Sequence, residues 1–200
     1  MPTIFTHPVV ALSGSCFFRR RPSIGLLVAG AACTVLPDLD VAAFYFGIPY
    51  EHPLGHRGVT HSLLFALLLG LAAAWLWRRF FEPRRPFASL ATFFVLATAS
   101  HGILDAFTNG GRGVGFFIPF DNARYFFPWR PIQVSPIGAS GFFERGWPAL
   151  ASELWWVWLP ALGLACVGRI VSSRRTGLLG TTSASRKRSG GTSDLASRSK

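Results

Sequence analysis

Most histidine and aspartate residues of this 200-residue chain fall into four short clusters, and imidazole and carboxylate groups are common metal ligands. The clusters are His7, Asp38 with Asp40, His56 with His61, and His101 with Asp105. Three of them lie inside apolar segments, and the fourth, His56 with His61, lies at the start of one. A carboxylate buried in lipid costs several kcal/mol unless it is paired or binds a cation. The sequence therefore predicts that the clusters share one metal site.

The spacing within two clusters suits the ligands of a single ion. His101 and Asp105 are four residues apart, so on a helix they lie on the same face. Asp38 and Asp40 are two apart, and we expect an extended stretch after Pro37 in which both point the same way.

The third cluster contains a glycine at a useful position. We expect Gly58 to let the chain turn as it enters the next helix, so that His56 and His61 both face inward. Imidazole combined with carboxylate suits zinc, manganese or iron. A cation held in this way lowers the pKa of bound water and supplies a nucleophile at neutral pH.

Each cluster taken alone also has a simpler interpretation. His101 and Asp105 could form a hydrogen-bonded pair on a helix, and Asp38 with Asp40 could mark a loop at a helix end. His7 alone is typical of a residue at a helix start. The metal hypothesis depends on the four clusters occurring together.

The composition indicates which elements must position these residues. Half of the residues are hydrophobic and 14% are charged, against about a quarter charged in soluble domains. Apolar segments cover residues 1–18, 23–48, 59–77, 87–107 and 154–171, the first of them marginal for the about 20 residues that cross a bilayer. We expect an all-α, polytopic membrane helix bundle with about four to five membrane segments.

The basic residues predict the orientation of this bundle. Fifteen Lys and Arg residues fall on one side of the predicted membrane segments and five on the other. The positive-inside rule then places the N-terminus outside and the C-terminus in the cytoplasm of a bacterial inner membrane. Residues 109–152 would form a cap on the outer surface. The membrane domain would cover residues 1–171, and residues 172–200 would be a disordered basic tail.

Helix heights bring the clusters to one layer. Counted from the cytoplasmic end of each segment, the expected heights are about 17 Å for His7, about 24 Å for Asp38 and His61, about 21 Å for His101, about 27 Å for Asp105 and about 31 Å for His56. The site would lie in the outer half of the membrane.

Other features exclude simpler classes of protein. The net charge of +11 sits in short clusters between apolar blocks and in the tail, which is typical of membrane loops and makes nucleic acid an unfavoured partner. The three cysteines are far apart, so they predict neither a disulfide framework nor a Cys-x-x-Cys metal site.

The combined motifs resemble a known family. Early His7, the Pro-Asp-Leu-Asp run at 37–40, His-Arg-Gly-Val-Thr-His-Ser at 56–62 and Ser-His-x-x-Leu-Asp at 100–105 resemble the LexA-regulated, inner-membrane-associated metal-dependent hydrolases. The run at 119–131 adds to this resemblance, which covers about residues 1 to 140. The motifs also distantly resemble those of zinc-dependent phospholipases C and single-strand nucleases.

The resemblance implies a ligand set and a cofactor. It assigns His7, Asp38 or Asp40, His61 and the His101–Asp105 pair to a divalent metal, zinc first and manganese as an alternative. This chain lacks the further histidines and the second helix, with its His-x-x-x-Glu motif, that complete the three-zinc site of those enzymes. One or two ions are therefore expected.

The leading functional hypothesis is a hydrolase acting on a phosphoester of a membrane lipid or lipid-linked substrate at the outer leaflet. His56, Arg57 and Asp40 are the expected catalytic residues, with His56 as a further ligand or proton shuttle and Arg57 as a receptor for phosphate oxygens. Other residues are expected to orient the ligands through hydrogen bonds (Thr60, Ser62 and Thr108) or to bind substrate from the cap (Arg124 and Arg130).

Two other classes of function stay open. Intramembrane carboxylates and imidazoles also mark the pathways of metal or proton transporters, although here no polar residues continue toward the cytoplasm. A non-catalytic membrane adaptor would use the metal for structure and the basic tail for anionic lipid or a partner. The oligomeric state is left open.

Overall fold

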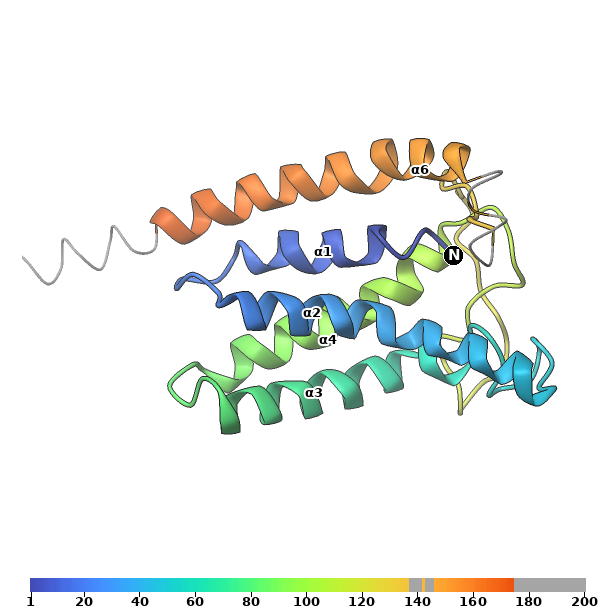
Figure 1. Ribbon diagram of the computed structural model, residues 1–200, viewed down its shortest axis with the longest axis horizontal. Helices are drawn as coiled ribbons and strands as arrows, with labels where there is room; N and C mark the ends of the chain where they lie inside the picture. The colour runs from blue at the N-terminus through green and yellow to red at the C-terminus, as the bar shows by residue number, and fades with distance from the viewer. Residues whose placement is uncertain (137–141, 143–145, 175–200) are drawn as a thin grey trace, which may run out of the picture.

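The computed structural model describes residues 1–136, 142 and 146–174, and within these residues every regular element is a helix. The all-α expectation is confirmed. The elements, which Figure 1 shows in chain order, are α1 (Thr6–Ser15), α2 (Ile24–Val35) continued by the 3₁₀ helix η1 (Leu36–Phe46), η2 (Val59–His61), α3 (Leu63–Phe80), α4 (Phe87–Ala106), and α6 (Trp147–Glu153) continued by the π-helical turn η3 (Leu154–Trp158).

Four helices are long and apolar enough to cross a membrane: Ile24–Phe46, Leu63–Phe80, Phe87–Ala106 and Trp147–Arg174. Their most apolar windows are only 17% to 39% buried inside the protein. Apolar side chains that face outward on such helices are stable in lipid and not in water. The polytopic helical bundle predicted from the sequence is therefore confirmed.

The segment boundaries differ from the expectation at both ends of the chain. α1 has ten residues and spans about 15 Å, so the segment at residues 1–18 does not cross the bilayer by itself. The last helix begins at Trp147, because Pro148 fits the first turn of a helix, and it shortens the expected 109–152 loop. It continues to Arg174, beyond the expected start of the tail. Residues 175–200 of that tail lie outside the described residues.

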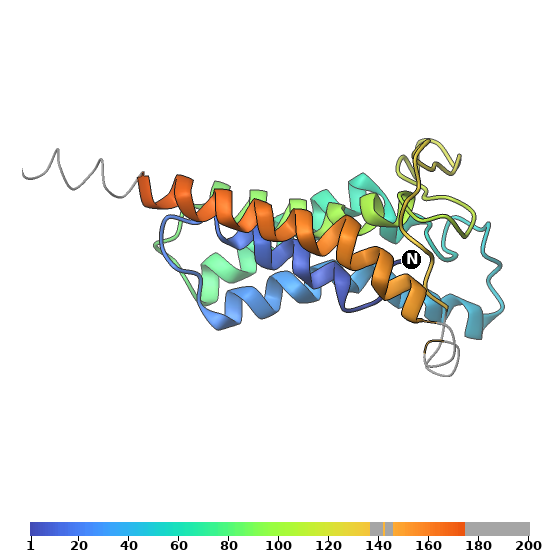
Figure 2. The same ribbon diagram turned by 90° about the horizontal axis from the view of Figure 1, so that it is seen from above.

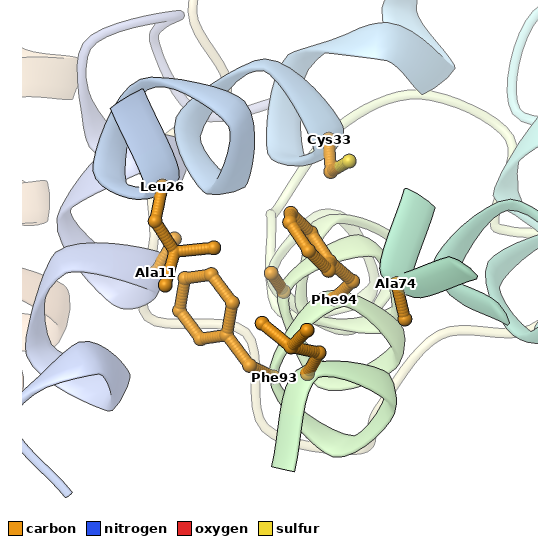
Figure 3. Close-up of a cluster of buried hydrophobic side chains, with 8 residues drawn as sticks. Ala11, Leu26, Cys33, Ala74, Phe93 and Phe94 are labelled. Carbon is orange, nitrogen blue, oxygen red and sulfur yellow. The ribbon is translucent and has the colours of Figure 1, made fainter. Parts of the chain in front are cut away.

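The core of the bundle is made of small and aromatic side chains from α1 to α4. In lipid, close packing rather than exclusion of water holds helices together. Figure 3 shows this contact between the helices, with Phe93 and Phe94 of α4 filling the space between the others (Ala11, Leu26, Cys33 and Ala74).

The two ends of the bundle carry different parts of the chain. The α1–α2 turn, the α3–α4 turn and the end of the last helix lie together at one end, on the left in Figure 1 and again in Figure 2. The chain start and the loops at 47–62 and 107–136 lie at the other end. This separation places the arginine-rich turns and the histidine and aspartate clusters at opposite ends.

Candidate metal centre

Asp38 and Asp40 belong to a helix and not to an extended stretch, so that part of the expectation is wrong. Pro37 lies in the first turn of η1, where its missing N–H is tolerated. Residues two apart on a 3₁₀ helix diverge by about 120°. Asp38 Oδ1 accordingly lies 3.3 Å from His101 Nε2, whereas Asp40 Oδ2 lies 3.1 Å from His61 Nδ1.

The loop before α3 turns both of its histidines inward, but not by the expected device. Arg57, not the glycine, adopts the left-handed conformation, with φ 60°. Gly58 is needed for space, since a Cβ there would lie 2.1 Å from Pro53 O. His56 and His61 are 2% and 4% exposed, as the sequence predicted for an inward turn.

α4 supplies the second half of the site. His101 and Asp105 lie on one face of this helix and both are 0% exposed, which confirms the i, i+4 prediction. Gly102 lies beside them, and a Cβ at this position would be 2.8 Å from the backbone oxygen of His61. The absence of a side chain there lets the loop pack against the helix.

Four side chains from three parts of the chain form one compact group: Asp38, His61, His101 and Asp105, whose metal-binding atoms all lie within 4.8 Å of one another. Donor pairs are separated by 2.9 Å (His61 Nε2 to His101 Nε2), 3.3 Å (His101 Nε2 to Asp38 Oδ1), 3.4 Å (His61 Nε2 to Asp105 Oδ2) and 3.8 Å (His61 Nε2 to Asp38 Oδ1). Tetrahedral zinc ligands are about 3.3 Å apart. The observed separations bracket that value.

Hydrogen bonds fix the orientation of both imidazoles. His101 Nδ1 lies 2.7 Å from the Thr34 carbonyl oxygen, which only accepts, so Nδ1 carries the proton. His61 Nδ1 lies 3.0 Å from Thr60 Oγ1, and because the Thr60 hydroxyl gives its own proton to Asp40 Oδ2, Nδ1 donates to Thr60; Asp40 Oδ2 is also 3.1 Å away as an ion-pair contact. In the neutral rings both Nε2 lone pairs then face each other across 2.9 Å. Two such lone pairs repel unless a positive species lies between them.

The two carboxylates of the group also lack hydrogen-bond partners among the described residues. The oxygens of Asp38 and Asp105 are buried, and no described residue donates a hydrogen bond to them. Arg57 Nε lies 2.9 Å from Asp105 Oδ2, but the contact is an ion pair and not an aligned hydrogen bond. One proton could be shared by only two of these four side chains, whereas a divalent cation could bind all four.

Asp40 lies on the far side of His61 from this group. Its Oδ1 accepts from His56 Nδ1 at 2.7 Å, and its Oδ2 accepts from Thr60 Oγ1 at 2.6 Å and from the Arg57 backbone N–H at 3.1 Å. Asp40, His56 and His61 form a second group with donor atoms within 4.8 Å of one another. A carboxylate behind a histidine is the usual arrangement that orients a metal ligand.

His7, like Asp40, is a sequence-predicted ligand outside the four-residue group. Its ring stacks on His101 with centroids 4.0 Å apart and an interplanar angle of 22°. The ring is fully buried, and neither nitrogen has a hydrogen-bond partner among the described residues. Leaving such a group unpaired costs about 1–3 kcal/mol, so His7 is placed for a ligand or a substrate group.

Arg57 lies inside the protein and is 1% exposed. Besides its ion pair with Asp105, its guanidinium donates to the Gly110 carbonyl at 3.1 Å and to Thr108 Oγ1 at 3.3 Å. Thr108 Oγ1 in turn donates to the backbone oxygen of Asp105 at 2.7 Å. These contacts make Arg57 a counter-charge for Asp105.

Thr60 and Ser62 have different surroundings. Thr60 contacts Asp40 and also lies 3.0 Å from His61 Nδ1. Ser62 caps α3: its hydroxyl accepts from the Phe65 N–H at 3.1 Å and donates to Val59 O at 2.7 Å. Thr60 therefore touches the site directly, whereas Ser62 holds the start of the helix.

The two arginines that the sequence predicted to bind substrate contact other loop residues. Arg124 donates to the carbonyl oxygens of His56 and Tyr50, both at 2.9 Å, and so closes the 47–62 loop. Burial raises the pKa of Tyr50, which therefore stays protonated at neutral pH. Arg130 lies over the Phe126 ring at 4.7 Å.

Glu153 is a buried acid that the sequence reasoning missed. It is 0% exposed, and its carboxylate accepts from the backbone N–H of Thr3 at 2.5 Å and from the hydroxyls of Thr3 and Thr6, each at 2.6 Å. An acid inside an apolar helix is itself a signal. Starting the last segment at residue 154 left Glu153 outside it and hid that signal.

Comparison with known proteins gives a family and a relative. The profile of the family described as "YdjM inner membrane protein" matches residues 1–176. The chain is 39% identical over 181 residues to "Inner membrane protein YbcI" of Escherichia coli (strain K12), covering 88% of this chain and 100% of the relative. No solved structure matches.

Proposed function

Since this chain belongs to the YdjM inner membrane protein family, we propose that it is a metal-dependent hydrolase embedded in the bacterial inner membrane. Asp38, His61, His101 and Asp105 hold the divalent cation, which is zinc, with manganese as the alternative. The substrate is a phosphoester of a lipid or lipid-linked molecule at the outer leaflet.

One observation is the main support for a bound metal. The Nδ1 atoms of His61 and His101 contact other protein groups, and their Nε2 atoms lie 2.9 Å apart. Two buried carboxylates without hydrogen-bond donors complete the group. Mixed nitrogen and oxygen donors at these separations suit zinc better than magnesium or calcium, which favour oxygen alone. The chemistry that such a cation supplies is the activation of water as a nucleophile at neutral pH.

The neighbouring side chains then have separate tasks. His7, with both nitrogens unpartnered beside His101, accepts a proton or provides a further ligand where a second ion binds. His56 passes protons from its place behind Asp40. Asp40 and Thr60 orient the ligands, and Arg57 balances the charge of Asp105.

The position of the site supports a lipid-linked substrate. The cluster lies at the loop-bearing end of a bundle whose helices face lipid, so a phosphate at headgroup height is the nearest phosphoester. Arg130, an exposed residue whose guanidinium lies over the Phe126 ring, and Arg124, which bonds to the His56 carbonyl, are the candidate contacts for that phosphate.

The test is hydrolysis by purified protein loaded with zinc or manganese. A synthetic phosphodiester and vesicles of defined phospholipids serve as substrates, with the wild type compared with His101→Ala and the control Ser100→Ala. Ser100 neighbours the ligand on α4, and its hydroxyl bonds only to Ala97 O among the described residues. If the wild type and His101→Ala hydrolyse the substrates at the same rate, or if neither hydrolyses them, the proposal of hydrolase activity is wrong.

A non-catalytic adaptor with a structural metal is the second candidate, and the burial of the group favours it. Closed sites with four protein ligands are typical of structural zinc, whereas catalytic zinc keeps one position open. His7→Ala separates the two functions. The hydrolase loses turnover at unchanged metal content, whereas the adaptor shows no turnover in any variant and a lower melting temperature after chelation.

Transport is less well supported. The described core between the site and the arginine-rich end is made of apolar side chains such as Leu26, Leu90 and Phe94, each 0% exposed. An ion path needs polar groups along its length. Metal uptake into proteoliposomes that His101→Ala abolishes would revive this function.

A further inference from the structure

A basic cavity lies at the opposite end of the bundle from the metal centre. It occupies about 640 Å³ between the α1–α2 turn and the α3–α4 turn. Four arginines and one acid line it, together with aromatic rings such as Phe17 and Phe81 (Arg19, Arg20, Arg84, Arg85 and Glu82). Both turns lie at the end of the bundle that is on the left in Figure 1.

The cavity carries uncompensated positive charge. Arg85 forms an ion pair with Glu82 and lies over the Phe18 ring at 4.8 Å. Burial alone would raise the pKa of Glu82, but hydrogen bonds from Arg85, Ser23 and Trp77 lower it, so the acid stays ionised. Within the described residues the other three arginines have no acidic partner. Their side chains are exposed and line the cavity, so their charge is available to an anion that enters it.

An apolar groove continues from this cavity into the membrane. The groove occupies about 650 Å³ between α1, α4 and the last helix, and it shares Phe17, Phe18 and Ser89 with the basic cavity. Further along, its walls are Gly14, Phe93 and other apolar residues. A basic space with room for a lipid headgroup, joined to an apolar groove with room for an acyl chain, matches the polarity of one phospholipid.

We propose that the two cavities together bind one anionic phospholipid. The unpaired guanidiniums of Arg19, Arg20 and Arg84 take the phosphate and its headgroup, because a planar guanidinium matches phosphate oxygens. An acyl chain lies in the groove between α1 and α4. Basic pockets between membrane helices at the charged end of a bundle suit anionic headgroups. The site is independent of the metal centre and of hydrolysis.

Binding of dioleoyl phosphatidylglycerol to the purified full-length protein, followed by native mass spectrometry, tests the headgroup contacts. The double variant Arg19→Gln/Arg84→Gln is expected to bind about 30-fold more weakly than the wild type. The control Arg78→Gln/Arg79→Gln removes the same charge at the same end but outside the cavity lining. It is expected to bind like the wild type. Equal losses in both variants, or equal wild-type binding of dioleoyl phosphatidylcholine, would overturn the proposal.

The groove has its own test. A Cβ on Gly14 or on Gly163 meets no atom within 4 Å, so leucine fits at either position without a clash at Cβ. Gly14 lines the groove, whereas Gly163 is not among its lining residues. Gly14→Leu is expected to weaken phosphatidylglycerol binding at least fivefold, with Gly163→Leu unchanged. If Gly14→Leu binds the lipid as tightly as the wild type, or if inorganic phosphate displaces the lipid, the site binds a soluble anion and the lipid proposal is wrong.

Discussion

His61 and His101 each use one ring nitrogen for the protein and present the other to the site. The Thr34 carbonyl holds His101 from behind, and Asp40 with Thr60 holds His61. Because these partners come from different elements, the two Nε2 atoms meet at a fixed place before any ion binds. Such preorganisation lowers the entropic cost of binding a cation.

Metal content is the most direct consequence at this scale. Wild-type protein is expected to retain about one equivalent of zinc after purification, because one ion satisfies the four donor groups. His101→Ala is expected to lose it, while Ser100→Ala keeps it. Elemental analysis of the three proteins decides, and equal zinc in wild type and His101→Ala would show that no ion depends on this cluster.

The two aspartates of η1 should differ in their effect. Asp40→Asn keeps the shape of a group that orients His61 and His56, so metal affinity should fall about 10–100-fold. Asp38→Asn replaces the carboxylate that lies 3.3 Å from His101 Nε2 by a neutral amide, a weaker ligand, and should lower the affinity further. Competition with a fluorescent zinc chelator measures both. The opposite order would make Asp40 the ligand and Asp38 the supporting residue.

The residues of the centre could be predicted in part from the sequence. A charged or imidazole group inside an apolar segment is visible there, and this pointed to Asp38, His61, His101 and Asp105. The Thr34 carbonyl was not predictable, because backbone groups leave no sequence signal. Asp38 and Asp40 could not be told apart, because an extended backbone would point both side chains the same way. The 3₁₀ helix points them in different directions.

At the scale of elements, the approach of the His61 loop to α4 depends on glycine. Gly102→Ala would place a Cβ 2.8 Å from His61 O, and overpacking of this kind costs about 1–3 kcal/mol. The control Gly14→Ala meets no atom within 4 Å and should stabilise α1 by about 0.5–1 kcal/mol. Thermal unfolding in detergent compares the two variants. Equal stability of both would mean that the loop does not press on α4.

The helices themselves were largely predictable, since long apolar runs and basic turns are strong signals. The failures lie at element ends. We expected an extended stretch after Pro37, but Pro37 lies in the first turn of η1, and Pro148 lies in the first turn of a last helix that begins before the expected residue 154. A proline fits either the end of one element or the first turn of the next, and the sequence alone does not distinguish the two.

At the scale of the whole molecule, polarity is divided between the two ends of the bundle. The histidine and aspartate cluster lies at one end, the basic cavity at the other, and the apolar core separates them. The sequence predicted this division, because segments of alternating direction return to the same end. The two ends of this bundle therefore carry different chemistry, acidic and imidazole groups at one end and arginines at the other.

The orientation of that division can be measured. Fifteen basic residues on one side against five on the other predict that the α3–α4 turn is cytoplasmic and the 107–136 loop periplasmic. The probes are Pro83→Cys and Asn122→Cys, both at exposed positions, in a protein whose Cys16, Cys33 and Cys166 are replaced by alanine. An impermeant maleimide added to spheroplasts should label Asn122→Cys alone, and inverted vesicles should reverse the result. Labelling of Pro83→Cys in intact spheroplasts would instead place the metal centre at the cytoplasmic face. The proposed substrate would then be a phosphoester reached from the cytoplasm and not one in the outer leaflet.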